Sequence, residues 1–305
     1  SADSYGWLTW LYFPCSRPSD FRTPYGHGWS AHHSDRVYWR YFIFNSFNEE
    51  GALVIEVQNL SKSYQGNNVL ENINVKFERG GITAIVGGNG AGKSTLLSII
   101  SQLEEADTGH VLFDGQNIGS ISRELLAKHL SILRQDNHLV GRLTVRDLVS
   151  FGRYPYSKGR LTQEDQNHVD TALRFLDLES LQHRYLDALS GGQRQRAFVA
   201  MVMCQDTDYV LLDEPLNNLD MKHSVAMMKM IRRLADEQNR TVLIVIHDIN
   251  FAAAYADRIL ALKQGKLICH DCPKTIMNSE TLELIFDTPV KVEEHDGRPL
   301  AVYYR

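Results

Sequence analysis

The alternation of hydrophobic and polar residues is regular from about residue 53 onward and predicts a domain of strands and helices. LVIEVQNL (53–60) alternates as a half-buried strand does. The later segments ITAIVG (82–87), YVLLD (209–213) and TVLIVI (241–246) are almost continuously apolar, which is typical of strands in a parallel sheet covered on both faces. We therefore predict an α/β fold.

Other segments supply the remaining elements. We expect further strands at INVKFERG, GHVLFDGQNI and LSILRQ (130–135), a hairpin at RILALKQGKLICH and a final strand pair in KVEEHDGRPLAVYYR. Helical periodicity is expected in STLLSIISQL, in SRELLAKHL with Ser122 as its N-cap, through most of residues 136–188, and near 222–238 and 248–257.

Residues 1–52 differ from this pattern. They contain all four Trp and sustain no apolar period, so we expect an extension outside the domain at 53–305. Glu49-Glu50-Gly51 is encoded by a purine-rich run that resembles a ribosome-binding site, and Val54 follows at the distance of a GTG start codon. Our hypothesis is that residues 1–53 are translated upstream sequence or a poorly folding extension. His27, His32 and His33 lack carboxylates or Cys at ligand spacing, so we predict no metal there.

Composition narrows the function classes. The net charge of −5 argues against nucleic acid as a partner, because that role needs a basic surface. No apolar run reaches the roughly 18 residues that span a bilayer. Cys269 and Cys272 form a CxxC, which can bind a metal or undergo redox chemistry. No second CxxC or clustered His completes a ligand set, so we favour a coincidental spacing near a strand end.

A glycine-rich motif follows the strand at 82–87. Residues 87–95 read GGNGAGKST, match GxxxxGK[ST] and open a helix. In such a loop, backbone N–H groups and the helix N-terminus face a phosphate chain. Lys93 is expected to reach the β- and γ-phosphates and Ser94 to ligate Mg²⁺. The predicted phosphate-binding residues are Gly87, Gly88, Asn89, Gly90, Ala91, Gly92, Lys93, Ser94 and Thr95.

Polar residues end three other strands. YVLLDE (209–214) ends in two carboxylates, and ligands of open α/β sheets bind at that carboxyl edge. Asp213 suits the Mg²⁺ shell, and Glu214 is a candidate general base for an attacking water. Gln135 can contact Mg²⁺ or water, and His247 can contact a γ-phosphate. Ordinary strand-end residues are the alternative interpretation of each.

Taken in order, these motifs resemble the nucleotide-binding subunit of an ATP-binding cassette (ABC) transporter. GGNGAGKST, Gln135, LSGGQ (189–193), YVLLDEP followed by NNLD (217–220), and His247 have that family's order and spacing. The resemblance covers 53–305. It implies a P-loop NTPase fold of the ABC type, with a mixed sheet core, an antiparallel β subdomain and a helical subdomain inserted at about 136–188. Gly88 departs from the family's usual Pro, but Gly can adopt the same backbone, so we expect activity to survive.

The resemblance also implies a site shared between two copies. Tyr64 matches the aromatic residue on which the adenine of ATP stacks, although a strand-surface Tyr remains the alternative. The family forms head-to-tail dimers, in which each ATP lies between the phosphate loop of one copy and the LSGGQ signature of the other. The residues implied to act in trans are Ser190, Gly191, Gly192, Gln193 and Asp220.

The segment LTVRDLVSFGRYP (143–155) resembles ABC ATPases that import iron–siderophore complexes, haem and cobalamin, most closely those for ferric catecholate siderophores of the petrobactin or vibriobactin type. This implies a homodimer under two membrane permease subunits, served by a substrate-binding protein, at the cytoplasmic face of the bacterial cell membrane. A haem or cobalamin importer is one alternative. An exporter and a soluble ATPase acting on ribosomes or DNA are others, but the chain has one cassette, no fused membrane helices and no heptad run.

Overall fold

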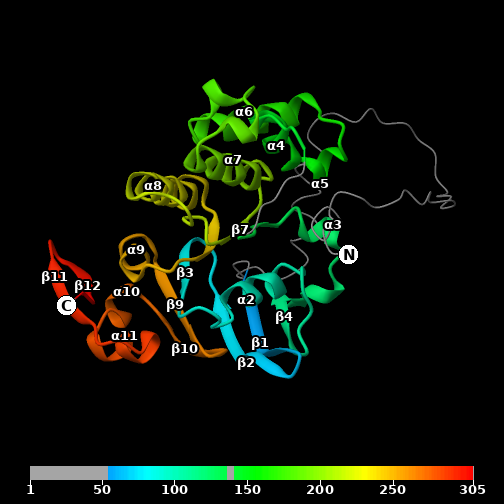
Figure 1. Ribbon diagram of the computed structural model, residues 1–305. Coiled ribbons are helices and arrows are strands. Elements are labelled where there is room, and N and C mark those ends of the chain that lie inside the picture. Colours follow the sequence, from blue (N-terminus) through cyan, green and yellow to red (C-terminus); the bar gives the residue numbers. More distant parts are fainter. Residues whose placement is uncertain (1–53, 136–140, 305) are drawn as a thin grey trace. The chain divides into compact units, whose positions relative to one another are not determined.

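The computed structural model describes residues 54–135 and 141–304 (Figure 1). The predictions for residues 1–53, including the three histidines and the upstream-translation hypothesis, lie outside these ranges. The boundary near residue 53 therefore stays a prediction. None of the helices in the described ranges is long and apolar enough to cross a membrane.

Within the described residues, the central sheet has six strands in the order β10-β9-β3-β8-β7-β6. The strands from β9 to β6 are parallel, and β10 is antiparallel to β9. Their bounds are β3 Gly81–Val86, β6 Leu130–Leu133, β7 Tyr209–Asp213, β8 Thr241–Val245, β9 Arg258–Lys263 and β10 Lys266–Asp271. The continuously apolar runs thus form the buried strands, as predicted.

A second, antiparallel sheet has the order β2-β1-β4-β5. Its strands are β1 Ile55–Tyr64, β2 Asn67–Phe77, β4 Thr108–Phe113 and β5 Gln116–Asn117. Together with helix α2 (Lys93–Ile100), this sheet encloses one hydrophobic cluster that includes Ile85, Leu211 and Leu243 of the central sheet. Because side chains alternate along a strand, their neighbours Ala84, Leu212 and Ile244 point to the other face and join a second cluster.

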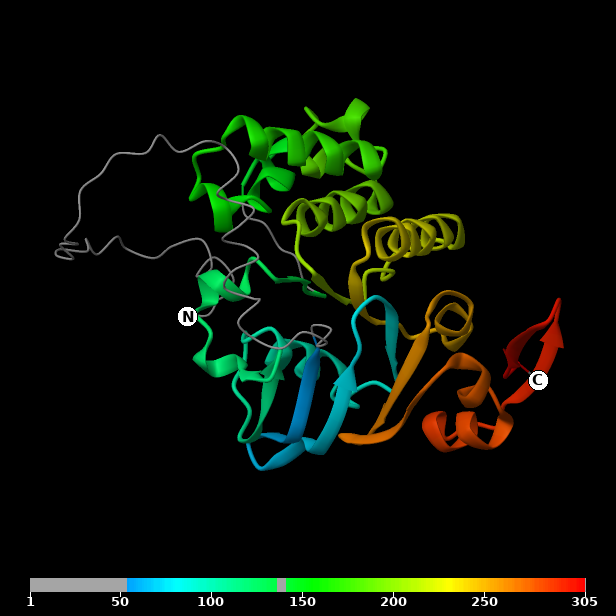
Figure 2. The same ribbon diagram turned by 180° about the vertical axis from the view of Figure 1, so that it is seen from behind.

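Helices cover that second face. They include α4 Val145–Phe151, α6 Gln163–Phe175, α7 Gly191–Cys204, α8 Met221–Gln238 and α9 Ile249–Tyr255. The short helix α5 Tyr154–Ser157 contributes no buried residue. Helices α4, α6 and α7 pack against one another, and Figure 2 shows them grouped together when seen from behind. Capping boxes begin α4 at Thr144, α6 at Thr162 and α7 at Ser190. This group is the predicted helical subdomain, with α7 added to it.

The remaining elements agree with the sequence less closely. SRELLAKHL forms only a single turn, α3 (Arg123–Leu126), which Ser122 caps as predicted. Helices α10 (Pro273–Ile276) and α11 (Ser279–Phe286) were not predicted, although Pro273 at the helix start and Asn278 as N-cap mark both. Among the described residues, three short 3₁₀ turns are η2 Ile118–Ser120, η3 Glu179–Leu181 and η4 Leu186–Ala188. The final pair is β11 Lys291–His295 and β12 Arg298–Val302.

Candidate functional site

The parallel register brings the predicted residues of four strands to one edge of the central sheet. Leu133 of β6 pairs with Leu212 of β7, and Val245 of β8 pairs with both Asp213 of β7 and Ile85 of β3. The chain leaves all four strands at this edge. The segments that follow contain Gln135 after β6, Glu214 after β7, His247 after β8 and the loop 87–92 after β3.

The glycine-rich loop curls around the buried ammonium group of Lys93. Lys93 is 5% exposed, and its Nζ donates to the carbonyl oxygens of Gly87 and Gly88, at 2.9 Å each. Gly87 has φ +142°, and a Cβ there would lie 2.0 Å from the carbonyl oxygen of Leu262. Gly92 has φ +97°, and a Cβ there would lie 2.5 Å from a methyl carbon of Leu70. Only glycine therefore fits these two positions.

A hydroxyl and a carboxylate lie beside this ammonium group. Ser94 Oγ donates to Asp213 Oδ1 over 3.0 Å. Burial lowers the pKa of Lys93, and the carboxylates of Glu214 and Asp213 oppose that shift. Burial likewise raises the pKa of Asp213, which is 7% exposed. Buried charges without full compensation favour a charged ligand. The ammonium suits phosphate oxygens, and the hard oxygen donors of Ser94 and Asp213 fit Mg²⁺.

Glu214 lies between two polar side chains. Its Oε1 is 2.7 Å from His247 Nε2, and its Oε2 accepts a hydrogen bond from Asn217 Nδ2. The Glu214 side chain is 9% exposed whereas that of His247 is 42% exposed, so the imidazole faces solvent and the carboxylate is sheltered. The backbone of Glu214 is left-handed, with φ +51°. A carboxylate held from both sides in this way can take a proton from a nearby water.

Asn217 was part of the NNLD motif in the sequence, but no contact with Glu214 was predicted for it. The contact arises because residues 214–217 form a turn in which Asn217 N–H donates to the Glu214 carbonyl oxygen over 3.2 Å. Gln135 is exposed two residues beyond the end of β6. It shares the sheet edge with Asp213, as its predicted role requires.

Tyr64 ends β1 beside the glycine-rich loop. Burial and a hydrogen bond with Glu104 raise the pKa of Tyr64 to about 12, and a hydrogen bond with Thr95, in the first turn of α2, acts in the opposite direction. The residue is 40% exposed, and the ammonium group of Lys62 lies 5.3 Å from the centre of its ring. An exposed aromatic face next to the phosphate loop is compatible with adenine stacking.

The LSGGQ segment begins helix α7. Ser190 Oγ accepts from Gln193 N–H over 3.4 Å, while Gln193 Oε1 accepts from Ser190 N–H over 3.1 Å. At Gly192, a Cβ would lie 2.8 Å from the ring of His223, so glycine permits this contact. Asp220 caps α8, and its Oδ1 accepts from His223 N–H over 2.8 Å. Within one chain, the signature and the NNLD segment are thus joined through His223. The predicted trans contacts of both segments stay predictions.

The CxxC pair is divided between two environments. Cys269 lies in β10, where burial raises the pKa of its thiol. Cys272 precedes α10 and is 3.3 Å from Thr275 Oγ1, a hydrogen bond that lowers its thiol pKa. In residues 54–135 and 141–304, no group of three or more His, Cys, Asp or Glu is placed to hold a metal ion.

Comparison with known proteins gives concordant matches. The ABC transporter family matches residues 70–217. The petrobactin import ATP-binding protein of Bacillus subtilis (strain 168) is 53% identical over 251 residues, which cover 82% of this chain and 100% of that protein. A petrobactin import ATP-binding protein of Bacillus anthracis is 49% identical over 250 residues, with coverages of 82% and 100%.

The fold has close counterparts among solved structures. One is an ATP-binding cassette in a dimeric, post-hydrolysis state bound to ADP and phosphate. It is 28% identical to this chain with a TM-score of 0.65, over 72% of this chain and 98% of that one. The resemblance noted from the motifs is confirmed.

Proposed function

Because this chain belongs to the ABC transporter family, with the ATP-binding proteins of siderophore importers as its relatives, we propose that it is the ATP-hydrolysing subunit of a ferric siderophore importer. Both relatives described above are named for petrobactin, so ferric petrobactin is the first substrate to test. Haem and cobalamin, which the sequence left open, come second.

One observation carries the proposal. A buried ammonium group, a hydroxyl–carboxylate pair and a sheltered carboxylate meet at a single sheet edge. Lys93 would hold the β- and γ-phosphates of ATP, and Tyr64 would stack on the adenine. Mg²⁺, held by Ser94, Asp213 and Gln135, would neutralise charge on the phosphates when bound.

The same geometry supports a hydrolytic step. Glu214 would accept a proton from the water whose oxygen attacks the γ-phosphorus, while the bond from that phosphorus to the bridging oxygen breaks. His247 would keep the carboxylate oriented through its 2.7 Å contact and would reach the γ-phosphate with its exposed ring. In this proposal Glu214 is the only side chain that exchanges a proton during the reaction. The other residues of the site hold the nucleotide, the metal ion and Glu214 itself in place.

The partners follow from the family. We infer a head-to-tail homodimer in which Ser190, Gly191, Gly192 and Gln193 contact the γ-phosphate of the partner copy's ATP and Asp220 crosses the interface. The helical subdomain at about 136–188 would dock on two permease subunits at the cytoplasmic face of the bacterial membrane, and a substrate-binding protein would deliver the siderophore. The helix N-terminus at Ser190 supports this role, because it favours an anion.

The test uses Glu214→Gln, which keeps the shape of the side chain and removes its proton-accepting charge. We expect the variant to bind ATP normally and to form a stable ATP-bound dimer. Its hydrolysis should fall by about 10²- to 10⁴-fold, the usual contribution of general base catalysis. Hydrolysis at the wild-type rate would remove Glu214 from its role.

The substrate is tested separately in cells. A strain that lacks this gene should lose uptake of radioactive iron supplied as ferric petrobactin. Wild-type protein should restore the uptake, and Glu214→Gln should not. Unchanged uptake in the deletion strain, together with lost uptake of iron from another siderophore, would keep the ATPase and reject petrobactin.

A further inference from the structure

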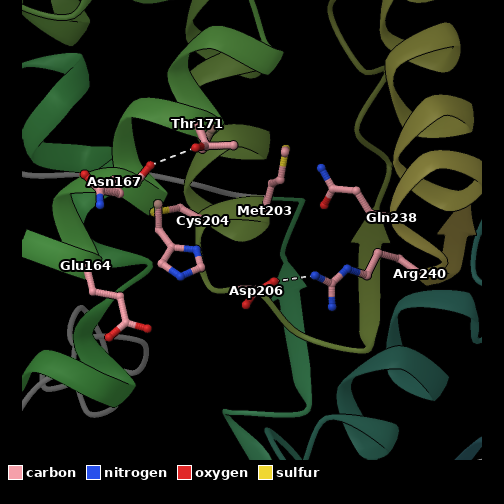
Figure 3. A pocket seen from close by; sticks show the side chains of 10 residues that line it. Glu164, Asn167, Thr171, Met203, Cys204, Asp206, Gln238 and Arg240 are labelled. Atoms are coloured by element: carbon pink, nitrogen blue, oxygen red, sulfur yellow. Dashed lines mark hydrogen bonds and ion pairs between the residues drawn. The ribbon is translucent and has the colours of Figure 1, made fainter. Parts of the chain in front are cut away.

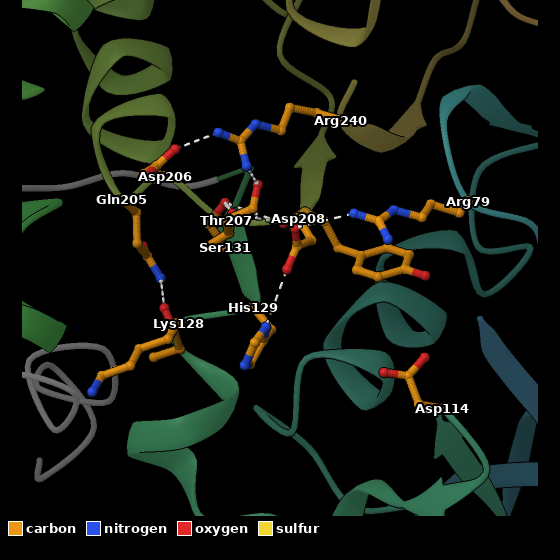
Figure 4. A network of polar contacts seen from close by, with 12 residues as sticks. Arg79, Asp114, Lys128, His129, Ser131, Gln205, Asp206, Thr207, Asp208 and Arg240 are labelled. Atoms are coloured by element: carbon orange, nitrogen blue, oxygen red, sulfur yellow. Dashed lines mark hydrogen bonds and ion pairs between the residues drawn. The ribbon is translucent and has the colours of Figure 1, made fainter. Parts of the chain in front are cut away.

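The loop Gln205–Asp208 joins the helical group to the central sheet. It follows α7, whose opposite end contains the signature, and it leads directly into β7, whose end contains Asp213. Figure 4 labels the residues of the loop. The loop therefore connects the two segments that are proposed to act on different ATP molecules. Arg153 binds the residue just before the loop, whereas Arg240 and Arg79 bind the loop itself.

Arg153 holds the helical side. Its Nη1 donates to the carbonyl oxygen of Cys204 over 3.1 Å, and its Nε donates to Asp165 Oδ1 over 2.9 Å. The Arg153 and Asp165 side chains are each 5% exposed. Since Asp165 is in α6, this buried ion pair fixes the last residue of α7 to the rest of the helical subdomain.

Arg240 holds the sheet side. It precedes β8, and its guanidinium forms a fork: Nη1 donates to the Thr207 carbonyl oxygen over 2.9 Å, and Nη2 pairs with the Asp206 carboxylate. The Thr207 hydroxyl is 2.7 Å from that of Ser131 in β6. Asp208 lies 3.1 Å from a ring nitrogen of His129, which precedes β6 (Figure 4). Residues 206–208 are therefore part of the sheet's framework.

Cys204 is thus bound to the helical subdomain, whereas Asp206, two residues later, is bound to the sheet. Asp206 has a left-handed backbone with φ +58°, which the Arg240 fork stabilises. Beside the loop lies a cavity of about 410 Å³, shown in Figure 3. Glu164 and Thr171 of α6 line one wall, and Gln238 and Arg240 line the other. Helix α6 therefore borders the cavity on the side that faces the end of α8.

We propose that Arg240 is a positioning residue, which sets the direction of α7 and thereby places Ser190 against the ATP of the partner copy. Helix α7 has 14 residues and so is about 21 Å long. A turn of roughly 10° at the loop would move Ser190 by roughly 4 Å, which exceeds the tolerance of a hydrogen bond. The inference rests on the proposed function, because it needs an ATP held between two copies.

The experiment compares Arg240→Met, which removes the fork, with Arg240→Lys, which keeps one donor. Arg258→Met is the matched control, since Arg258 belongs to β9 and its guanidinium pairs with Glu78 over 3.1 Å rather than with the loop. ATP binding by the isolated chain, kcat and KM for hydrolysis, and ATP-driven dimer formation in a Glu214→Gln background are measured. We expect Arg240→Met to lower kcat by at least about tenfold, because small misplacements of reacting groups slow reactions strongly.

The pattern of effects separates positioning from a general loss of structure. Arg240→Met should leave single-chain ATP affinity within about twofold and should weaken dimer formation, with Arg240→Lys in between and Arg258→Met unchanged. A double-mutant cycle with Asp206→Asn should show coupling in kcat and none in ATP affinity. If Arg240→Met fails to fold, Arg240→Lys and Asp206→Asn provide the same comparison.

Three results are decisive. An unchanged kcat in the folded Arg240 variants, with an active wild type, would overturn the positioning role and leave the proposed function intact. Wild-type protein that does not hydrolyse ATP at any concentration would instead reject the proposed function itself. Equal losses of ATP affinity and kcat would assign Arg240 to the stability of the fold.

Discussion

At the scale of single residues, the glycine-rich loop contains two kinds of glycine. Gly87 has φ +142° and no room for a Cβ, whereas Gly88 lies outside the left-handed region and has nothing within 4 Å of a Cβ. Gly88 is also the position where the chain departs from the family's usual Pro. Gly87 therefore requires glycine, as Gly92 does, whereas the neighbouring position 88 has room for a side chain.

This difference predicts opposite outcomes for two neighbouring substitutions. Gly87→Ala should lose ATP binding and destabilise the fold by about 1–3 kcal/mol, because of the strained backbone and the contact with the Leu262 carbonyl oxygen. Gly88→Ala should retain ATP binding and raise stability by about 0.4–1 kcal/mol through the unfolded chain. Urea denaturation and titration with a fluorescent ATP analogue measure both. Similar behaviour of the two variants would show that the loop differs from this geometry.

The sequence predicted the residues of the site better than their contacts. Lys93 was identified from the GxxxxGK[ST] motif after β3. Asp213 and His247 were identified from their places at the carboxyl ends of apolar strands, which parallel register brings together. The bond from Asn217 to Glu214 was not predictable in that way. It depends on the left-handed backbone of Glu214, which an isolated motif does not reveal.

At the scale of elements, the start of helix α7 combines a structural and a proposed chemical role. Ser190 forms a capping box with Gln193 and is exposed. The same hydroxyl is the proposed donor to the partner copy's ATP. Substitution there should therefore affect two observables to different degrees.

Ser190→Arg should abolish measurable hydrolysis and leave ATP binding by the single chain largely intact. Loss of the cap should lower stability by about 1 kcal/mol. Asn278→Arg, which removes the cap of α11, should lower stability similarly and keep hydrolysis. Steady-state hydrolysis, nucleotide titration and thermal melting distinguish the two variants. Loss of nucleotide binding by the isolated Ser190→Arg chain would argue against action in trans.

Element prediction succeeded where periodicity was long and failed where it was short. The apolar runs of β3, β7 and β8 and the long helices α6 and α8 match the predicted segments. Helices α10 and α11 have four and eight residues, too few for a helical period to stand out after the hairpin. The turn and N-cap residues Pro273 and Asn278 were the available signals.

At the scale of the whole molecule, the two sheets meet at a half-buried histidine. His270 of β10 has its ring 5.9 Å from that of Phe77 in β2, and its Nε2 is buried without a hydrogen-bond partner among the described residues. Burial and then the guanidinium of Arg258 lower the pKa of His270, against the opposing charges of Glu78 and Asp271. The folded protein therefore prefers a neutral imidazole at this seam.

Because the pKa of His270 is lowered in the folded protein, the fold is expected to lose stability as the pH falls. As the pH falls through about 6.5, His270 becomes protonated in the unfolded chain but stays neutral in the folded chain. The free energy of unfolding therefore decreases until the pH passes the folded-state pKa of His270. The loss is about 1.4 kcal/mol for each pH unit by which the folded-state pKa lies below that of the unfolded chain. His270→Phe should remove this contribution, which urea denaturation at pH 7.5 and 5.5 measures. A constant stability difference between the variant and the wild type across this range would contradict it.

The left-handed backbone at Glu214 sets the stability of the fold against its proposed activity. An L-residue in that conformation is disfavoured by roughly 1–2 kcal/mol, and glycine would relieve it. Substitution of Glu214 by glycine would therefore relieve the backbone and at the same time remove the proposed general base. At this position a more stable fold and a retained carboxylate therefore exclude each other, so selection for turnover and selection for stability would act in opposite directions.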